Sequence, residues 1–400
     1  MTHKKENKTM KRVLSLIILG FFLVSCGAKS PFNAAKGKPN TVVLSFDATP
    51  KPTPPPINLS PINAGNVDQI KSLYKIHLNE DPRAEDLLAI SPDKMWAALT
   101  PKDGAPLHLQ RLKWAPDDSF VPMGNGFSTF YLYRTASLAF SPDATHVAIA
   151  NGADNSVLVY ELVDLPSEGE QTVLSVGDRP ESITFTKDSQ KLVIGTQNGA
   201  EGSLQLWNLK TASIEREISR NMPGGVCSAA ISPDGKILAA GYCTKTFNIS
   251  TWEVDKDYTP LSQLTGLDRV GPCTDPCPHQ RNIFAFNPVT GEIASGFDFP
   301  HISIHDPRTG KLNAIVTTNP VGDTLNGGDS VSALAFTSDG AILVIAASQE
   351  LQLIDAKDGK LLWHHEDPKP ITAATISADS KLLTSVNSDG DWVFWGVPGK

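Results

Sequence analysis

The chain has 400 residues, of which 40% are hydrophobic and 20% are charged, and its formal net charge is −8. This composition is typical of a globular protein and excludes a largely disordered chain. Residues 1–25 contain five basic residues and one acidic residue, so the remainder carries a formal charge of −12. Such an acidic body argues against binding through charge to nucleic acid or to anionic lipid. We therefore expect no nucleic-acid partner.

The N-terminus has the organisation of an export signal. Residues 1–12 are basic, and residues 13–24 form an apolar run that is shorter than the ~20 residues needed to cross a bilayer. Residues 23–27, LVSCG, follow and resemble the lipobox of bacterial lipoproteins. The resemblance implies that residues 1–25 are a signal peptide and that Cys26 becomes the lipid-bearing N-terminal residue. An incidental cysteine after a short apolar helix is the structural alternative.

A proline-rich segment follows, with eight prolines in residues 27–61. Such chains are extended and semi-rigid. We therefore expect residues 26–61 to be a lipidated linker that holds a domain of residues 62–400 away from a membrane. The protein would then lie outside the cytoplasm, anchored by lipid to the bacterial cell membrane, or to the outer membrane in a Gram-negative cell.

A unit of apolar strand, polar turn and second apolar strand recurs seven times, at residues 87–99, 138–150, 183–195, 229–241, 284–296, 334–346 and 374–386. The turns begin 40 to 55 residues apart, which is close to the ~40–50 residues of one four-stranded propeller blade. Their Pro, Asp and Gly residues suit tight turns. We therefore interpret the repeated turn aspartates as hairpin residues and not as a catalytic constellation.

A third strand follows each pair, and four of these strands end in Trp207-Asn208, Trp252-Glu253, His305-Asp306 and Ile354-Asp355. These endings resemble the Trp-Asp ending of the WD-repeat family. The resemblance extends over about residues 66–396. The family's opening Gly-His pair is missing, so its hydrogen-bonded His-Ser-Trp-Asp network is expected to be absent. Asp-Gly-Lys-Leu turns also resemble quinoprotein-type repeats. The resemblance implies an all-β fold, a seven-bladed β-propeller of four-stranded antiparallel blades.

The last repeat supplies only three strands, near residues 371–376, 381–386 and 391–395. An open sheet edge invites aggregation, so a propeller has to close its ring. Residues 70–77 precede the first repeat and alternate like a strand. We predict that they complete the last blade.

Four cysteines follow Cys26, namely Cys227, Cys243, Cys273 and Cys277. An exported protein meets an oxidising compartment, and four cysteines allow three pairings. We favour 227–243, across one hairpin, and 273–277. The alternative is a metal site of Cys273, Asp275, Cys277 and His279, but the compartment favours disulfides, so we expect no metal.

The sequence shows no nucleophile elbow, metal-protease motif or nucleotide-binding loop, and we expect no catalytic residues and no cofactor. One pattern suggests binding. Five repeats carry a basic residue six to eight positions before the turn: Arg83, Arg134, Arg179, Arg281 and Lys369. In a propeller, these residues would ring the mouth of the channel and bind an anionic ligand or a partner's carboxylates. The structural alternative is local pairing with Glu85, Glu181 or Asp367.

Two functions remain open. The first is a membrane-tethered, monomeric scaffold that binds a protein partner or a ligand, neither of which the sequence identifies. The alternative is a propeller enzyme or small-ligand sensor, which would need His, Asp or Glu side chains converging at the channel mouth. The sequence places mainly Arg, Pro and Gly there, and it therefore favours the scaffold.

Overall fold

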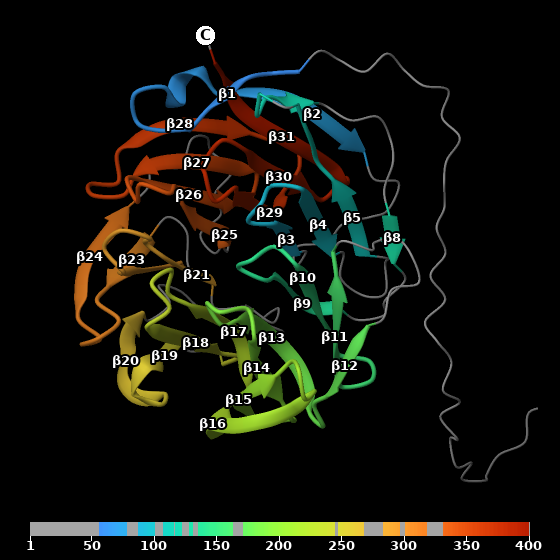
Figure 1. The fold of residues 1–400 in the computed structure, drawn as a ribbon. Coiled ribbons are helices and arrows are strands. Elements are labelled where there is room, and N and C mark those ends of the chain that lie inside the picture. The colour runs from blue at the N-terminus through green and yellow to red at the C-terminus, as the bar shows by residue number, and fades with distance from the viewer. Residues whose placement is uncertain are drawn as a thin grey trace, which may run out of the picture. The chain divides into compact units, whose positions relative to one another are not determined.

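The seven strand–turn–strand units of the sequence form the inner strands of a seven-bladed β-propeller (Figure 1). The computed structural model describes residues 56–77, 87–100, 107–115, 117–121, 128–130, 135–162, 171–244, 247–267, 283–296, 301–317 and 331–399. These residues belong to one compact unit, Asn40–Lys400. They contain no α-helix, only the short 3-10 helices η1 (Val67–Gln69) and η2 (Val254–Lys256).

Each blade is an antiparallel sheet whose first strand lies innermost. The first three blades are β3 (Leu87–Ile90), β4 (Trp96–Thr100), β5 (Leu107–Arg111) and β8 (Ser128–Phe130); β9 (Thr135–Phe140), β10 (His146–Asn151), β11 (Ser156–Glu161) and β12 (Thr172–Ser175); and β13 (Arg179–Phe185), β14 (Lys191–Gln197), β15 (Glu201–Asn208) and β16 (Ser213–Pro223).

The remaining blades repeat this order, except that the last is completed from the N-terminal side of the chain. They are β17 (Val226–Ile231), β18 (Ile237–Tyr242), β19 (Phe247–Glu253) and β20 (Thr259–Leu267); β21 (Ile283–Phe286), β22 (Ile293–Gly296), β23 (His301–His305) and β24 (Leu312–Thr317); β25 (Val331–Phe336), β26 (Ile342–Ala347), β27 (Glu350–Asp355) and β28 (Leu361–Glu366); and β29 (Ile371–Ile376), β30 (Leu383–Asn387), β31 (Asp391–Pro398) and β2 (Lys71–His77).

The turn between the first two strands of a blade is built by its own side chains. In six blades the hydroxyl of the first turn residue donates to the Asp two positions later at 2.5–2.7 Å. The same hydroxyl oxygen accepts the backbone N–H five positions later. The structure therefore confirms that the turn aspartates are hairpin residues. The fifth blade uses Asn287, whose Nδ2 instead donates to the Gly340 carbonyl of the next turn at 2.9 Å.

Small side chains recur at one position of the inner strands. The second residue before each turn is Ala or Thr in all seven blades, and each of these residues is half-buried: Ala89, Ala139, Thr184, Ala230, Ala285, Ala335 and Thr375. Larger apolar side chains fill the space between neighbouring blades, where the core lies.

The predicted closing strand is confirmed. β2 pairs with β31 along its length, with Ile76 opposite Trp392. The residues just before β2, which the sequence analysis assigned to the linker, also pair with the propeller. β1 (Leu59–Ser60) pairs with the end of β31, and Ile57 exchanges two backbone hydrogen bonds of 2.7 Å with Phe120. Phe120 belongs to the hairpin of β6 (Lys113–Trp114) and β7 (Phe120–Val121), so the N-terminal segment joins the seventh blade to the first.

The Trp of the repeat occupies one register position of each third strand, opposite the residue six positions after the first residue of the inner turn. Around the ring this position holds Gln110, Tyr160, Trp207, Trp252, His305, Ile354 and Trp395. The Trp207 indole donates to Gln205 at 2.8 Å and that of Trp395 to Ser385 at 2.9 Å, so neither uses a histidine. His305 is fully buried, and neither ring nitrogen has a hydrogen-bond partner among the described residues.

Candidate functional site

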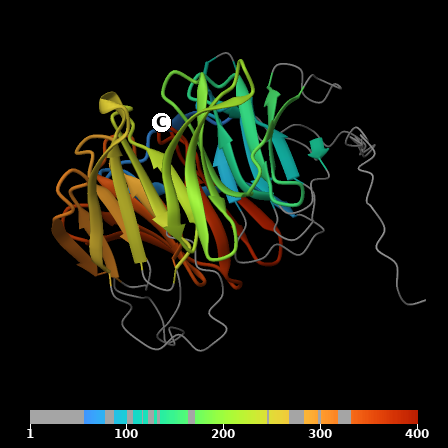
Figure 2. The same cartoon turned by 90° about the horizontal axis from the view of Figure 1, so that it is seen from below.

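The two ends of the ring are built differently. The turn face carries the seven inner turns and the turns between third and fourth strands. The mouth face is the opposite end, where the inner strands begin, and its described part comprises residues 152–155, 176–181, 198–202, 222–227, 243–244, 348–350, 366–372 and 387–391. Figure 2 shows the blade strands running between these two ends.

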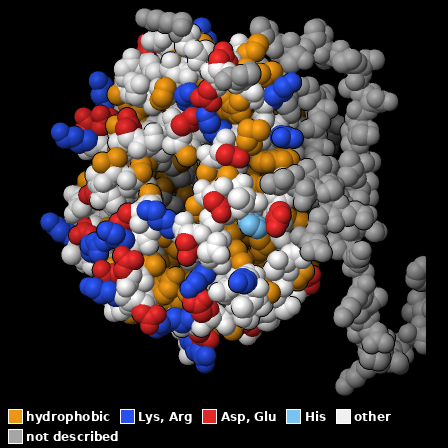
Figure 3. All heavy atoms as spheres, viewed as in Figure 1, with side chains coloured by type: hydrophobic (Ala, Val, Ile, Leu, Met, Phe, Trp, Pro, Cys, Tyr) orange, Lys and Arg blue, Asp and Glu red, His pale blue; other side chains and the backbone are white. Residues whose placement is uncertain are grey.

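The segments that join successive blades at the mouth face differ widely in length. They range from residues 224–225, between β16 and β17, to residues 268–282, between β20 and β21. The inner turns on the turn face, by contrast, share one length, and six of the seven share one hydrogen-bond pattern. Figure 3 views the turn face, where acidic and basic side chains are intermixed. Because connections of variable length on a rigid scaffold commonly form binding sites, the mouth face is the candidate site.

A disulfide joins Cys227 and Cys243 at the mouth face, with a Cα–Cα distance of 5.1 Å. Cys227 is the second residue of β17, and Cys243 follows β18, so this is the cross-hairpin pairing favoured from the sequence. The bond holds the beginning of the connection after β18 against the inner strand. Cys273 and Cys277 lie outside the described residues, as does Cys26.

A β-bulge recurs near the start of five inner strands, always at the residue five positions before the turn. The bulged residues are Ala136, Glu181, Cys227, Ser332 and Thr372. Bulges redirect side chains and are frequent beside functional sites. Glu181 and Cys227 thus occupy equivalent positions on adjacent blades. Sequence reasoning missed this feature, although the constant spacing from the turn could have revealed it.

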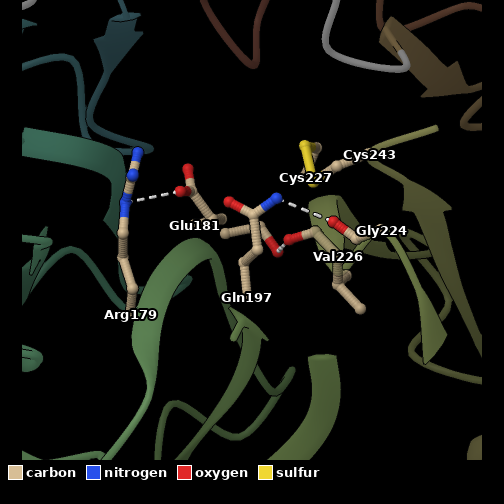
Figure 4. The surroundings of a disulfide bond; sticks show 8 residues. Arg179, Glu181, Gln197, Gly224, Val226, Cys227 and Cys243 are labelled. Atoms are coloured by element: carbon tan, nitrogen blue, oxygen red, sulfur yellow. Dashed lines mark hydrogen bonds and ion pairs between the residues drawn. A yellow bond between two sulfur atoms is a disulfide. The ribbon is translucent and has the colours of Figure 1, made fainter. Parts of the chain in front are cut away.

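Arg179 and Glu181 form an ion pair at the start of β13, with Arg179 Nε 2.7 Å from Glu181 Oε1. The carboxylate side chain is only 10% exposed, whereas the arginine side chain is 45% exposed. Figure 4 shows both side chains on the same side of the strands as Gln197 and the disulfide. A buried carboxylate is costly unless it is paired, so Glu181 holds the guanidinium in place.

Two glycines allow the neighbouring segment to pass close to this row of side chains. Gln197 Nε2 donates to the Gly224 carbonyl at 2.8 Å. Gly224 and Gly225 have φ values of +74° and +87°, and a Cβ would lie 2.7 Å from the Cys243 carbonyl oxygen in one case and 2.8 Å from the Gln197 side chain in the other. Only glycine fits both the backbone conformation and the space. The short connection thereby packs directly against the Gln197 side chain.

The structure places two of the five basic residues predicted at the channel mouth. Arg179 and Lys369 both lie on the mouth face, and each has a local acidic partner: Glu181 for Arg179, and Asp389, at 3.4 Å, for Lys369. Arg83, Arg134 and Arg281 lie outside the described residues. The Asp367 carboxylate does not pair with the Lys369 ammonium, but it accepts the Lys369 backbone N–H at 3.0 Å.

Asp367 is a buried acid at the boundary of the sixth and seventh blades. It accepts a hydrogen bond from Asn387 Nδ2 at 2.7 Å, and His365 Nε2 lies 3.8 Å away. Burial alone would raise the pKa of this carboxyl, but the interaction with His365 and the hydrogen bond from Asn387 outweigh burial and hold the pKa below its usual value. These contacts tie the two blades together. His364, on the same strand as His365, is exposed.

Within the described residues, no group of three or more His, Cys, Asp or Glu side chains is arranged to hold a metal ion. None of the helices in the described part of the chain has the length and apolar character to span a bilayer. Comparison of the sequence with models of known protein families and with curated proteins finds no match.

Proposed function

We propose that this protein is a lipid-anchored bacterial propeller of WD-repeat type that lies outside the cytoplasm and binds a partner through its mouth face. The observation that carries the proposal is the difference between the two ends of the ring. The inner turns of the turn face are nearly uniform and self-satisfied, although its outer connections vary in length from residues 209–212 to residues 112–127. The mouth face combines connections of unequal length, a disulfide and an arginine positioned by a buried carboxylate.

The path of the N-terminal segment supports a partner site on the mouth face. Ile57 pairs with Phe120, Ile62 N–H donates to the Ser380 carbonyl at 2.8 Å, and the Asn58 carbonyl accepts from Gly399 N–H at 2.7 Å. Ser380 belongs to an inner turn and Gly399 follows the end of β31, so the segment joins the ring at the turn face. A linker that arrives there leaves the mouth face free for a partner.

The proposed anchor is supported by the order of basic region, apolar run and LVSCG in residues 1–27. The Cys227–Cys243 disulfide is compatible with an oxidising compartment outside the cytoplasm. Replacing Cys26 by Ala in the full chain tests the anchor. The wild-type protein should fractionate with membranes and take up radiolabelled palmitate, whereas the C26A variant should lose the label. Equal labelling of both would contradict the anchor.

Binding through the mouth face is tested by photo-crosslinking in cells that make the full-length protein. A photoreactive amino acid replaces Glu201 at the mouth end of β15 in one variant, and Lys210, just beyond the turn-face end of the same strand, in another. Both side chains are exposed, so the two positions differ mainly in the face that they occupy. The proposal expects defined adducts from position 201 and none from position 210. Adducts from position 210 alone would overturn it.

A further inference from the structure

The Arg179 guanidinium has an unused pair of donors. Its Nε donates to Glu181 Oε1 at 2.7 Å, and within the described part of the chain no other partner of this side chain is present. The two terminal nitrogens Nη1 and Nη2 therefore retain the planar fork that matches a carboxylate. The side chain is 45% exposed on the mouth face (Figure 4), so a ligand can reach these nitrogens.

Glu181 fixes the direction in which that fork points. The carboxylate is buried, and it comes from the bulge of the same strand, two residues after Arg179. Separating the pair would leave a buried charge without a partner, which is strongly unfavourable. The arginine therefore loses little rotamer freedom when it binds a ligand, and this reduces one of the costs of association.

An acceptor stands in the same row of side chains, beyond Glu181 (Figure 4). The Gln197 amide nitrogen is occupied by the Gly224 carbonyl, and this orients its Oε1 as an acceptor with no hydrogen-bond partner among the described residues. Figure 4 shows the Arg179, Glu181 and Gln197 head groups in a row that leads to the disulfide of the next blade. A ligand that carries a carboxylate and a nearby N–H matches this row, and a peptide has both groups.

Charge disfavours a multiply charged ligand. Arg179 and Glu181 together are neutral, and Asp178 precedes them in the chain, so a dianion such as phosphate would meet no net positive charge there. A carboxylate needs only the two directed hydrogen bonds of the fork. Lys369 offers no equivalent, because its single ammonium group already pairs with Asp389.

We propose that Arg179, positioned by Glu181, binds one carboxylate of a peptide ligand, and that Gln197 accepts a backbone N–H of the same peptide. The carboxylate is either a C-terminus or an acidic side chain. This inference rests on the proposed function, since it names the chemistry of the partner that the mouth face would bind.

The test uses the full-length protein in detergent and pools of random octapeptides, with bound peptides quantified by mass spectrometry. One pool has free C-termini and lacks Asp and Glu, a second is amidated and lacks Asp and Glu, and a third is amidated with one internal Glu. The first or the third pool should be retained at least about tenfold more than the second. Whichever of the two is retained identifies the source of the carboxylate. Equal retention of all three pools would overturn the proposal.

Variants distinguish the directed hydrogen bonds of the Arg179 fork from a general effect of positive charge. Arg179→Lys keeps the positive charge but removes the fork, and it should reduce retention about tenfold or more. Gln197→Leu should weaken retention of the same pool. The control, Lys357→Ala, removes an exposed positive charge from the turn face and should retain the wild-type amount. Thermal unfolding and an intact-mass measurement show whether each variant keeps its fold and disulfide. Unchanged retention by a folded R179K variant would overturn the proposal.

The crosslinking experiment distinguishes failure of this inference from failure of the proposed function. Adducts from position 201 together with unchanged retention by R179K would leave the mouth face as the binding site but remove Arg179 from it. Adducts from position 210 alone would remove both.

Discussion

Lys94 Nζ lies 2.7 Å from Asp379 Oδ2, so the inner turn of the first blade is ion-paired with the inner turn of the seventh. The same ammonium lies 3.0 Å from Asp118 and 4.4 Å from the centre of the Trp114 ring. Burial alone would lower the pKa of Lys94, but the hydrogen bonds to Asp379 and Asp118 raise it overall. The contact therefore reinforces the ring at the place where its two ends meet.

We predict that Lys94→Met destabilises the protein by about 1 kcal/mol, because the partly exposed pair is screened by solvent. Methionine keeps the packing against Trp114 and removes only the charge. Urea denaturation at neutral pH measures the effect. Lys357→Met is the control, because Lys357 is exposed and its ammonium forms no ion pair with the described residues. An equal effect of both substitutions would contradict the role of Lys94.

The closing strand supplies a second prediction. Ile76 is 4% exposed and packs in a cluster with Trp392 and Phe394. Ile76→Ala should lower the free energy of unfolding by about 2–4 kcal/mol, the usual loss for a buried isoleucine. Ser72→Ala, at an exposed position on the same strand, should change it by less than about 0.5 kcal/mol. Similar stability of the two variants would show that β2 does not close the ring.

His305 makes stability depend on pH. Burial lowers its pKa from the ordinary value, so the unfolded chain binds a proton more readily than the folded protein. The folded protein therefore keeps its full free energy of unfolding above the unfolded pKa of about 6.5. That free energy falls as the pH drops from this value toward the lower folded pKa. His305→Leu should be more stable than wild type by about 1 kcal/mol at pH 7, and the difference should widen by pH 5. A constant difference would contradict this reading.

The disulfide should contribute strongly to stability. Its cysteines are 16 residues apart in the chain, and closing a loop of that size corresponds to about 3 kcal/mol in the chain-entropy description. Cys227→Ser with Cys243→Ser should therefore lower the urea midpoint. We expect a reducing agent to lower the midpoint of wild type toward that of the double variant. A double variant as stable as wild type would contradict the prediction.

Local chemistry explains which parts of the fold could be predicted from the sequence. The Ser141-Pro-Asp143 type of turn closes through its own side chains, so each hairpin is specified by a few adjacent residues. The Cys227–Cys243 pairing follows from one such hairpin. The closing strand was predictable because the last repeat lacks a partner for β31.

The contacts that sequence reasoning missed join residues far apart in the chain. Lys94 with Asp379, Ile57 with Phe120 and Gln197 with Gly224 depend on how the blades pack. The acidic partners of the basic residues were likewise predictable only where they lie close in the sequence. The local partner of Arg179 was foreseen two residues away, whereas Asp389, the partner of Lys369, lies across the hairpin of β29 and β30.

The most direct test of binding through the mouth face is the ratio of photo-crosslinked adducts at position 201 to those at position 210 in cells that make the full-length protein. The two positions lie at opposite ends of the same blade, so the ratio reports which face meets a partner. We predict defined adducts at position 201 and none at position 210. Equal yields at both positions, or adducts at position 210 alone, would contradict a function carried by the mouth face.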